Sequence, residues 1–173
     1  AVSIPGILYN VPSRTALNMD SATTLRLADV PNIVGVKEAS SDPDQIAYVI
    51  KDSPEGFRVW SGNDNEILST MAVGGYGIVS VAGNIISGQI QKMMGLLLEG
   101  DVEAAAAEHL RLLPIFNALF YITNPIPIRY AMNRSGFSVG PARLPMVPEP
   151  SELAVFSAKF DPIMDQYAID LAD

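Results

Sequence analysis

The sequence predicts an α/β protein in which four parallel βα units are followed by a helical appendix. Three observations lead to this fold class. Short apolar runs of strand length begin near residues 7, 33, 57 and 77. A segment with helical character separates each run from the next, which is the pattern of a parallel sheet. After Ala82 the strand-like runs stop and only helical segments follow.

The four strands are expected where apolar runs are bounded by turn residues, at Ile4–Asn10, Ile33–Lys37, Phe57–Ser61 and Gly77–Val81. A loop, Val11–Thr15, should follow the first strand. The helices between the strands are expected at Ser21–Ala28, from Ser41-Asp42-Pro43 onward, and from about Glu66 to Val73. Asp20 or Ser21 is a suitable N-cap for the first helix, and a proline near the first turn favours the second.

The appendix is expected to contain four helices, at Ser87–Glu99, Asp101–Tyr121, Ile126–Arg134 and Ser151–Tyr167. Pro114 interrupts the apolar stripe of the long helix, where we expect a kink. A cluster of prolines between residues 141 and 150 predicts an irregular connection before the last helix.

Composition excludes several classes of protein. The 173 residues suffice for one domain with a sizeable core, and 49% hydrophobic against 17% charged residues argues against disorder. No apolar run reaches membrane-spanning length, and no secretory signal is expected. The absence of cysteine excludes thiolate metal sites and fits a cytoplasmic protein. The net charge of −8 argues against a nucleic-acid surface, so an anionic ligand would need local cations.

Lys37 is the candidate nucleophile. Lys51, Lys92 and Lys159 lie among polar residues or on helical segments, whereas Lys37 continues the apolar run that begins at Ile33. An ammonium group buried in such a setting is costly unless it is paired, so it tends to lose its proton. The neutral amine can then form a Schiff base with a carbonyl substrate. The alternative is a lysine that ends an ordinary strand and points to water.

Parallel βα arrays keep their chemistry at the carboxyl ends of the strands. Here those ends should bring together Tyr9, Arg14 and Lys37, with small polar or glycine residues after the third and fourth strands. Lysine can form an imine with a keto acid, arginine can hold a carboxylate in a bidentate fork, and tyrosine can relay a proton. This set indicates a lysine-dependent lyase. The alternatives are that Tyr9 is a half-buried core tyrosine and that Arg14 is a solvated loop charge.

Two motifs make the chain similar to a known family. The segments Tyr9–Thr15 (YNVPSRT) and Val34–Ala39 (VGVKEA) stand at the spacing of successive strands. With them the chain resembles the dihydrodipicolinate synthase (4-hydroxy-tetrahydrodipicolinate synthase) family of pyruvate-dependent class I aldolases, which includes N-acetylneuraminate lyase. Further segments extend the resemblance over nearly the whole chain: Ser61–Asp64, Gly74–Val81, Asn124–Ile128 and Arg143–Met146.

The resemblance implies roles for four residues. Lys37 would form the Schiff base with pyruvate, and Tyr9 would belong to a proton relay beside it. Arg14 would bind the carboxylate of the second substrate, aspartate semialdehyde, and this arginine favours the synthase over N-acetylneuraminate lyase. Val79 would line the pyruvate pocket through its main-chain carbonyl. The family's reaction belongs to the diaminopimelate route to lysine and uses no metal or organic cofactor, and a homo-oligomer, a dimer or tetramer, is expected.

The resemblance also implies a TIM (β/α)8 barrel with additional C-terminal helices, of which this chain holds only the C-terminal half. Residues 1–86 would form the second half of the barrel, and residues 87–173 its last helix and the C-terminal helical region. The relay threonines and other elements of the first half have no counterpart, so we expect the N-terminal half of the barrel to be a required partner. Two alternatives stay open: an aldolase for another 2-keto acid, and a non-catalytic half-barrel that serves as an assembly module.

Overall fold

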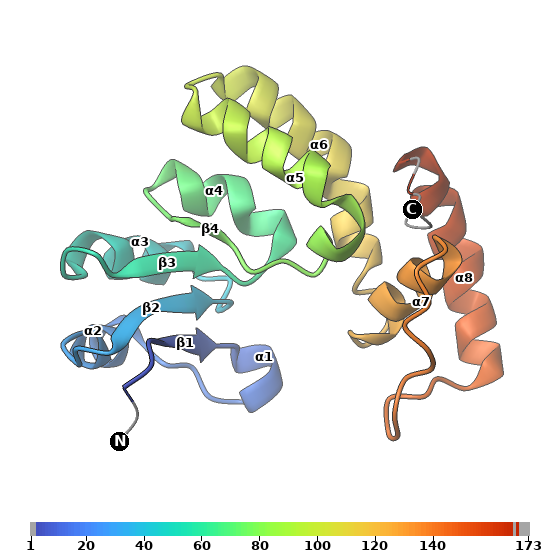
Figure 1. Ribbon diagram of the computed structural model, residues 1–173, viewed down its shortest axis with the longest axis horizontal. Helices are drawn as coiled ribbons and strands as arrows, with labels where there is room; N and C mark the ends of the chain where they lie inside the picture. The colour runs from blue at the N-terminus through green and yellow to red at the C-terminus, as the bar shows by residue number, and fades with distance from the viewer. Residues whose placement is uncertain (1–2, 168, 170–173) are drawn as a thin grey trace. The chain divides into compact units, whose positions relative to one another are not determined.

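The computed structural model describes residues 3–167 and 169 (Figure 1). The chain divides into two compact units, Ala1–Ser80 and Val81–Asp173. They are called the strand unit and the helical unit below.

The strand unit is a parallel four-stranded sheet with the strand order β1-β2-β3-β4 (Figure 1). Its strands are β1 (Gly6–Asn10), β2 (Ile33–Glu38), β3 (Arg58–Ser61) and β4 (Gly77–Ile78). The connecting helices are α1 (Pro12–Thr15), α2 (Ser21–Ala28), α3 (Pro43–Asp52) and α4 (Ile67–Ala72), with a 3-10 turn η1 (Asp64–Glu66) before α4. Neighbouring strands run in parallel and helices connect them, so the predicted βα array is confirmed.

Carboxylate caps set the start of two of these helices. Asp20 Oδ1 accepts a hydrogen bond from the Thr23 N–H at 2.7 Å, and Asp42 Oδ1 accepts one from the Gln45 N–H at 3.0 Å. Each cap satisfies an amide group that has no partner within the first helical turn. Pro43 follows the second cap, where its missing N–H leaves nothing unpaired.

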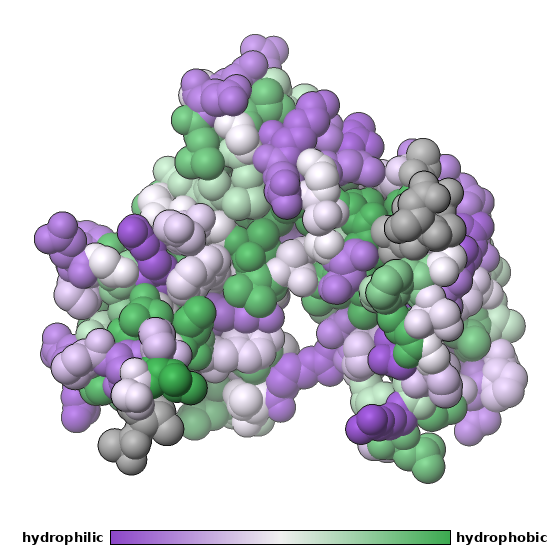
Figure 2. Space-filling model, viewed as in Figure 1, coloured by the Kyte–Doolittle hydropathy of each residue, from purple (hydrophilic) through white to green (hydrophobic). Residues whose placement is uncertain are grey.

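One face of the sheet packs against the helices. Val36 on β2, Val49 on α3 and Val59 on β3 form a buried cluster. Four partly buried residues pack around it: Leu8, Met19, Ile50 and Phe57. Because side chains alternate along a strand, Ile7 and Tyr9 project from the opposite face, and both are about half exposed. Figure 2 shows hydrophobic residues at the surface of this unit.

The helical unit contains α5 (Gly83–Leu98), α6 (Val102–Ala118), α7 (Ile126–Arg134) and α8 (Pro150–Met164), followed by a 3-10 turn η2 (Asp165–Tyr167). Tyr130 on α7 packs edge-on against Phe156 of α8, with ring centroids 5.4 Å apart, and its hydroxyl donates to Asp161 at 3.1 Å. Burial and this bond raise the pKa of Tyr130. Arg134 pairs with Asp161 at 3.3 Å, which adds a charged contact between the two helices.

Several predicted boundaries need correction, and the three that follow have a bearing on the site or on the start of the helical unit. Residues Pro12–Thr15 form a single helical turn where the sequence predicts a loop. β4 ends at Ile78 rather than Val81, because β3 ends at Ser61 and offers no further partner. α5 begins at Gly83, before the predicted Ser87, and is interrupted by non-helical backbone at Ile86. None of the helices within residues 3–167 combines the length and the apolar character that a membrane span requires.

Candidate functional site at the carboxyl edge of the strands

The ladder of the first three strands sets Lys37 in a row with two aromatic residues. Lys37 on β2 is in parallel register with Tyr9 on β1 and with Trp60 on β3. Residues in register on neighbouring strands project from the same face of a sheet. The amine therefore lies between Tyr9 and Trp60, on the face opposite to the valine cluster.

Lys37 differs from the other lysines in its surroundings. Its side chain is half-buried on a strand, whereas Lys51, Lys92 and Lys159 are exposed on helices. Lys51 pairs with Asp52 at 3.1 Å, while Lys37 forms no ion pair with any residue in the ranges 3–167 and 169. Lys37 is less buried than the sequence predicts, because its neighbour Tyr9 on the same face is itself exposed.

Tyr9 lies beside the amine. Lys37 Nζ is 4.3 Å from the centroid of the Tyr9 ring, within the range of a cation–π contact. Tyr9 is 53% exposed, so about half of its side chain is accessible at this edge of the sheet. A phenol can give or take a proton, so adjacent strands bring together an amine and a proton-transfer group.

Two glycines next to Lys37 and Trp60 have no side chain that would occupy the space of these two residues. A Cβ on Gly62 would lie 3.2 Å from Lys37 Cε and 2.6 Å from Ala39 Cβ. A Cβ on Gly35 would lie 2.5 Å from Trp60 Cζ3. Side chains at these positions would displace Lys37 and the Trp60 ring. From the sequence Gly62 is predictable only as a turn residue, since its closeness to Lys37 depends on the packing of β2 against β3.

Arg14 and Val79 lie at the same edge of the sheet. Arg14 is on α1, directly after β1, and its exposed side chain forms no ion pair with a residue that the structure describes. Val79 follows β4 and donates its N–H to the Ser61 carbonyl at 3.0 Å. Val79 lies two residues beyond Gly77, which is level with Trp60 and Lys37, so two strand spacings and two residues of rise place its backbone roughly 12 Å from that of Lys37. The structure thus brings Lys37 and Tyr9 into contact, and Arg14 and Val79 flank this pair.

The edge of the sheet also holds a buried polar network that the sequence motifs do not predict. Glu38 is fully buried, and its carboxylate accepts hydrogen bonds from the Ser40 N–H at 2.8 Å, the Asn10 amide at 2.9 Å and the Gln45 amide at 3.2 Å. All of these donors are neutral. The signal that could have revealed the network is alternation, which puts Glu38 on the same side of β2 as the core residue Val36.

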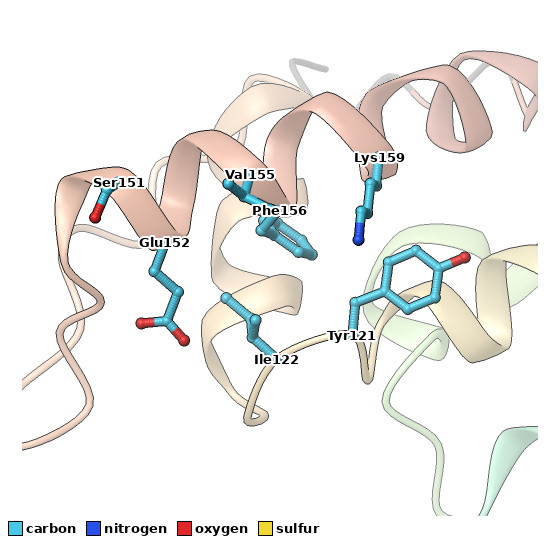
Figure 3. A pocket seen from close by; sticks show the side chains of 7 residues that line it. All are labelled: Tyr121, Ile122, Ser151, Glu152, Val155, Phe156 and Lys159. Atoms are coloured by element: carbon cyan, nitrogen blue, oxygen red, sulfur yellow. The ribbon is translucent and has the colours of Figure 1, made fainter.

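The helical unit has a separate hollow of about 630 Å³ (Figure 3). It is lined by Tyr121 and Ile122 and by side chains of α8: Ser151, Glu152, Val155, Phe156 and Lys159. Lys159 and Tyr121 repeat the residue types of the strand edge, but Lys159 is exposed and has no cation–π contact with a described residue. No group of three histidine or acidic side chains within the described ranges could hold a metal ion.

Comparison with known proteins identifies a family that matches most of the chain. The model of the Dihydrodipicolinate synthetase family matches residues 1–155. The 4-hydroxy-tetrahydrodipicolinate synthase of Symbiobacterium thermophilum is 55% identical over 148 residues, which are 85% of this chain and 50% of that protein. The chain spans about half the length of the curated relatives it matches.

Solved structures also match this chain over little more than half of their own length. The dihydrodipicolinate synthase of Aquifex aeolicus superposes with a TM-score of 0.91 at 35% identity, over 99% of this chain and 58% of that one. The chloride-inhibited dihydrodipicolinate synthase of Acinetobacter baumannii, solved in complex with pyruvate, gives a TM-score of 0.85 at 30% identity, over 94% of this chain and 56% of that one. The four βα units and the helical region therefore make up about half of a TIM-barrel fold, consistent with its C-terminal part.

Proposed function

The chain belongs to the dihydrodipicolinate synthetase family, and from this premise we propose that it supplies the Schiff-base half of a 4-hydroxy-tetrahydrodipicolinate synthase. In this proposal pyruvate condenses with aspartate semialdehyde at the carboxyl edge of the strand unit. The observation that carries the proposal is the pair of Lys37 and Tyr9, whose Nζ and ring centroid are 4.3 Å apart at that edge.

Lys37 acts as the nucleophile. Its unprotonated amine attacks the keto carbon of pyruvate, the carbonyl oxygen leaves as water, and an imine remains. Loss of a proton from the methyl group gives an enamine, whose carbon attacks the aldehyde carbon of the second substrate. The amino group of that substrate then displaces Lys37 from the imine and closes the ring. Tyr9 on the neighbouring strand gives and takes protons in these steps.

Both substrates are anions, while the chain carries a net charge of −8, so local cations must attract them. Arg14 is suited to this role because its exposed guanidinium can form a bidentate fork with the carboxylate of aspartate semialdehyde. Val79 lines the pyruvate subsite through its main-chain carbonyl. The relative from Acinetobacter baumannii, which was solved with pyruvate, supports pyruvate as the first substrate.

The site requires the N-terminal half of the barrel as a partner. A closed βα barrel needs about eight strands, because strand tilt and register must let the last strand meet the first. The strand unit has four, and Ile7 and Tyr9 are exposed on the face that a barrel would enclose. A homo-oligomer in the cytoplasm is part of the same proposal.

A chimaera tests the proposal. Residues 1–173 would be joined behind the N-terminal half of the Symbiobacterium thermophilum relative, which is 55% identical in the shared part. Condensation of pyruvate with aspartate semialdehyde should be measurable, and Lys37→Ala should abolish it. Lys51→Ala is the matched control, because Lys51 is an exposed lysine outside the site, and it should retain the activity. Turnover by the Lys37→Ala variant at the unsubstituted rate would refute the assignment.

A further inference from the structure

We propose that Glu38 is a positioning residue, whose buried carboxylate ties the loop that carries Arg14 to the strand that carries Lys37. Glu38 thereby fixes the position of Arg14, which binds the aldehyde substrate, relative to the nucleophile Lys37. The inference rests on the proposed function, because it gives Arg14 and Lys37 the roles described above. The loop is residues 11–17, between β1 and α2.

Asn10 closes this loop at both of its ends. Its Nδ2 donates to Asn18 Oδ1 at 2.8 Å and to the Met19 carbonyl at 3.2 Å, and its Oδ1 accepts from the Met19 N–H at 2.9 Å. Asn10 is itself only 2% exposed. The residues before and after the loop are therefore held together by one buried amide, and Arg14 lies between them.

Glu38 fixes that amide to β2. Both of its carboxylate oxygens accept from Asn10 Nδ2, at 2.9 and 3.2 Å. Gln45 on α3 completes the network, since its Nε2 donates to Glu38 Oε2 at 3.2 Å and to the Met19 carbonyl at 3.2 Å. A carboxylate only accepts hydrogen bonds, whereas an amide at this position would bring donors of its own toward Asn10 or Gln45.

The network is placed to act on geometry. Glu38 and Lys37 are adjacent on β2, and their side chains project from opposite faces, so the residue that anchors the loop shares a peptide bond with the nucleophile. Arg14 has no ion pair with a residue in the described part of the chain, and its N–H donates to the Val11 carbonyl at 2.9 Å within the loop, so the loop and the attachment of its ends set the position of Arg14. A displacement of about 1 Å between reacting groups can lower a rate by about 100-fold.

Glu38→Gln in the chimaera tests the inference, because it keeps the shape of the side chain and disturbs only the hydrogen bonding. We expect the KM for aspartate semialdehyde to rise by about tenfold to 100-fold, with the rate of pyruvate adduct formation on Lys37 nearly unchanged. The matched control is Val49→Ala, which opens the fully buried valine cluster outside the network. It should lower the melting temperature without raising the KM for aspartate semialdehyde relative to the rate of pyruvate adduct formation.

Two further measurements keep the test decisive if Glu38→Gln folds poorly. Asn18 is an exposed member of the network and links Asn10 to Gln45. Asn18→Ala should likewise raise the KM for aspartate semialdehyde and leave pyruvate adduct formation nearly unchanged. Hydrogen exchange needs no catalysis: amides of residues 11–19 should exchange faster in Glu38→Gln than in the unsubstituted protein, and not in Val49→Ala.

The outcomes separate the inference from the proposed function. If the unsubstituted chimaera forms no pyruvate adduct, the proposed function fails, and this inference fails with it as an account of catalysis. If the chimaera condenses both substrates and Glu38→Gln keeps the unsubstituted KM for the aldehyde, the inference alone is overturned. An equal loss of pyruvate trapping and aldehyde use would likewise overturn it in favour of a purely structural role.

Discussion

Replacing Gly62 with alanine should disable the candidate site by displacing the nucleophile. Gly62 follows β3, and its N–H donates to the Glu38 carbonyl at 2.7 Å, which holds its backbone against β2. A Cβ there would lie 2.6 Å from Ala39 Cβ, about 0.8 Å inside the 3.4 Å at which ordinary contact begins. It would also lie 3.1 Å from the Glu38 carbonyl oxygen and 3.2 Å from Lys37 Cε. Of these obstacles only the lysine side chain is flexible.

Two effects of different size should follow from this substitution. Overpacking of this kind typically costs about 1–3 kcal/mol of folding free energy. The contact with Lys37 Cε requires a movement of only a few tenths of an ångström, but the overlap with Ala39 Cβ has to be relieved by the backbone that carries Lys37. If that movement displaces the amine by about 1 Å, the rate of pyruvate adduct formation should fall by about 100-fold. Urea unfolding and borohydride trapping of the chimaera would measure the two effects separately.

Gly88→Ala is the matched control for this prediction. Gly88 lies inside α5, where a Cβ meets no atom within 4 Å, so alanine should be neutral or stabilise the helix by about 0.5–1 kcal/mol. It should leave adduct formation unchanged. If Gly62→Ala traps pyruvate as fast as Gly88→Ala does, the packing of Gly62 does not position Lys37 and the reasoning is refuted.

Three further predictions follow from the structure. Arg14→Ala should weaken use of aspartate semialdehyde by about 2–5 kcal/mol while sparing pyruvate trapping; Arg26→Ala on α2 is the control, and equal loss of both activities would give the loop a structural role. Burial lowers the pKa of His109 below its usual value, so the unfolded chain binds more protons and the protein should lose stability as the pH falls below about 6.5. His109→Gln should flatten the slope of melting temperature against pH between about 7.5 and 5.5, and an unchanged slope would contradict this. The chain expressed alone should be inactive and should self-associate or aggregate, because β1 and β4 are open edges and Ile7 is 52% exposed. Ile7→Lys should reduce that association in sedimentation velocity, whereas an active, monodisperse monomer with a cooperative thermal transition would disprove the prediction.

Elements whose start has a local signal are predictable from the sequence to the residue. The helix at Ser21–Ala28 has its predicted bounds because the carboxylate of Asp20 caps it. The helix at Ile126–Arg134 does too, because prolines cluster at its first turn. The order of the four strands follows from the βα repeat, since each connection is long enough to return the chain to the same edge.

Elements that depend on partners were not predictable. β4 is shorter than the apolar run Gly77–Val81, because a ladder extends only as far as its neighbouring strand. α1 is a single turn, too short for helical periodicity, and Ala16 ends it with a φ of 56°. His109 lies on α6 with its ring against Phe116, and its Nδ1 is buried without a hydrogen-bond partner among the described residues, which helical periodicity alone does not predict.

The same distinction holds for the candidate site. Lys37 and Tyr9 follow from the rule that parallel strands carry their chemistry at the carboxyl ends. The network of Asn10, Glu38 and Gln45 joins residues up to 28 positions apart in the chain. Alternation along β2 could have shown that Glu38 is buried, but its partners depend on how three segments pack together. For the same reason Gly62 could not be connected to the lysine.

Covalent trapping tests most directly whether Lys37 forms a Schiff base with pyruvate. The chimaera would be incubated with pyruvate and borohydride, digested, and mapped by mass spectrometry across all of its lysines. We expect a reduced pyruvyl group on Lys37, and Lys37→Ala should abolish it. An adduct on Lys51, Lys92, Lys159 or a lysine of the added half, with Lys37 unmodified, would contradict it.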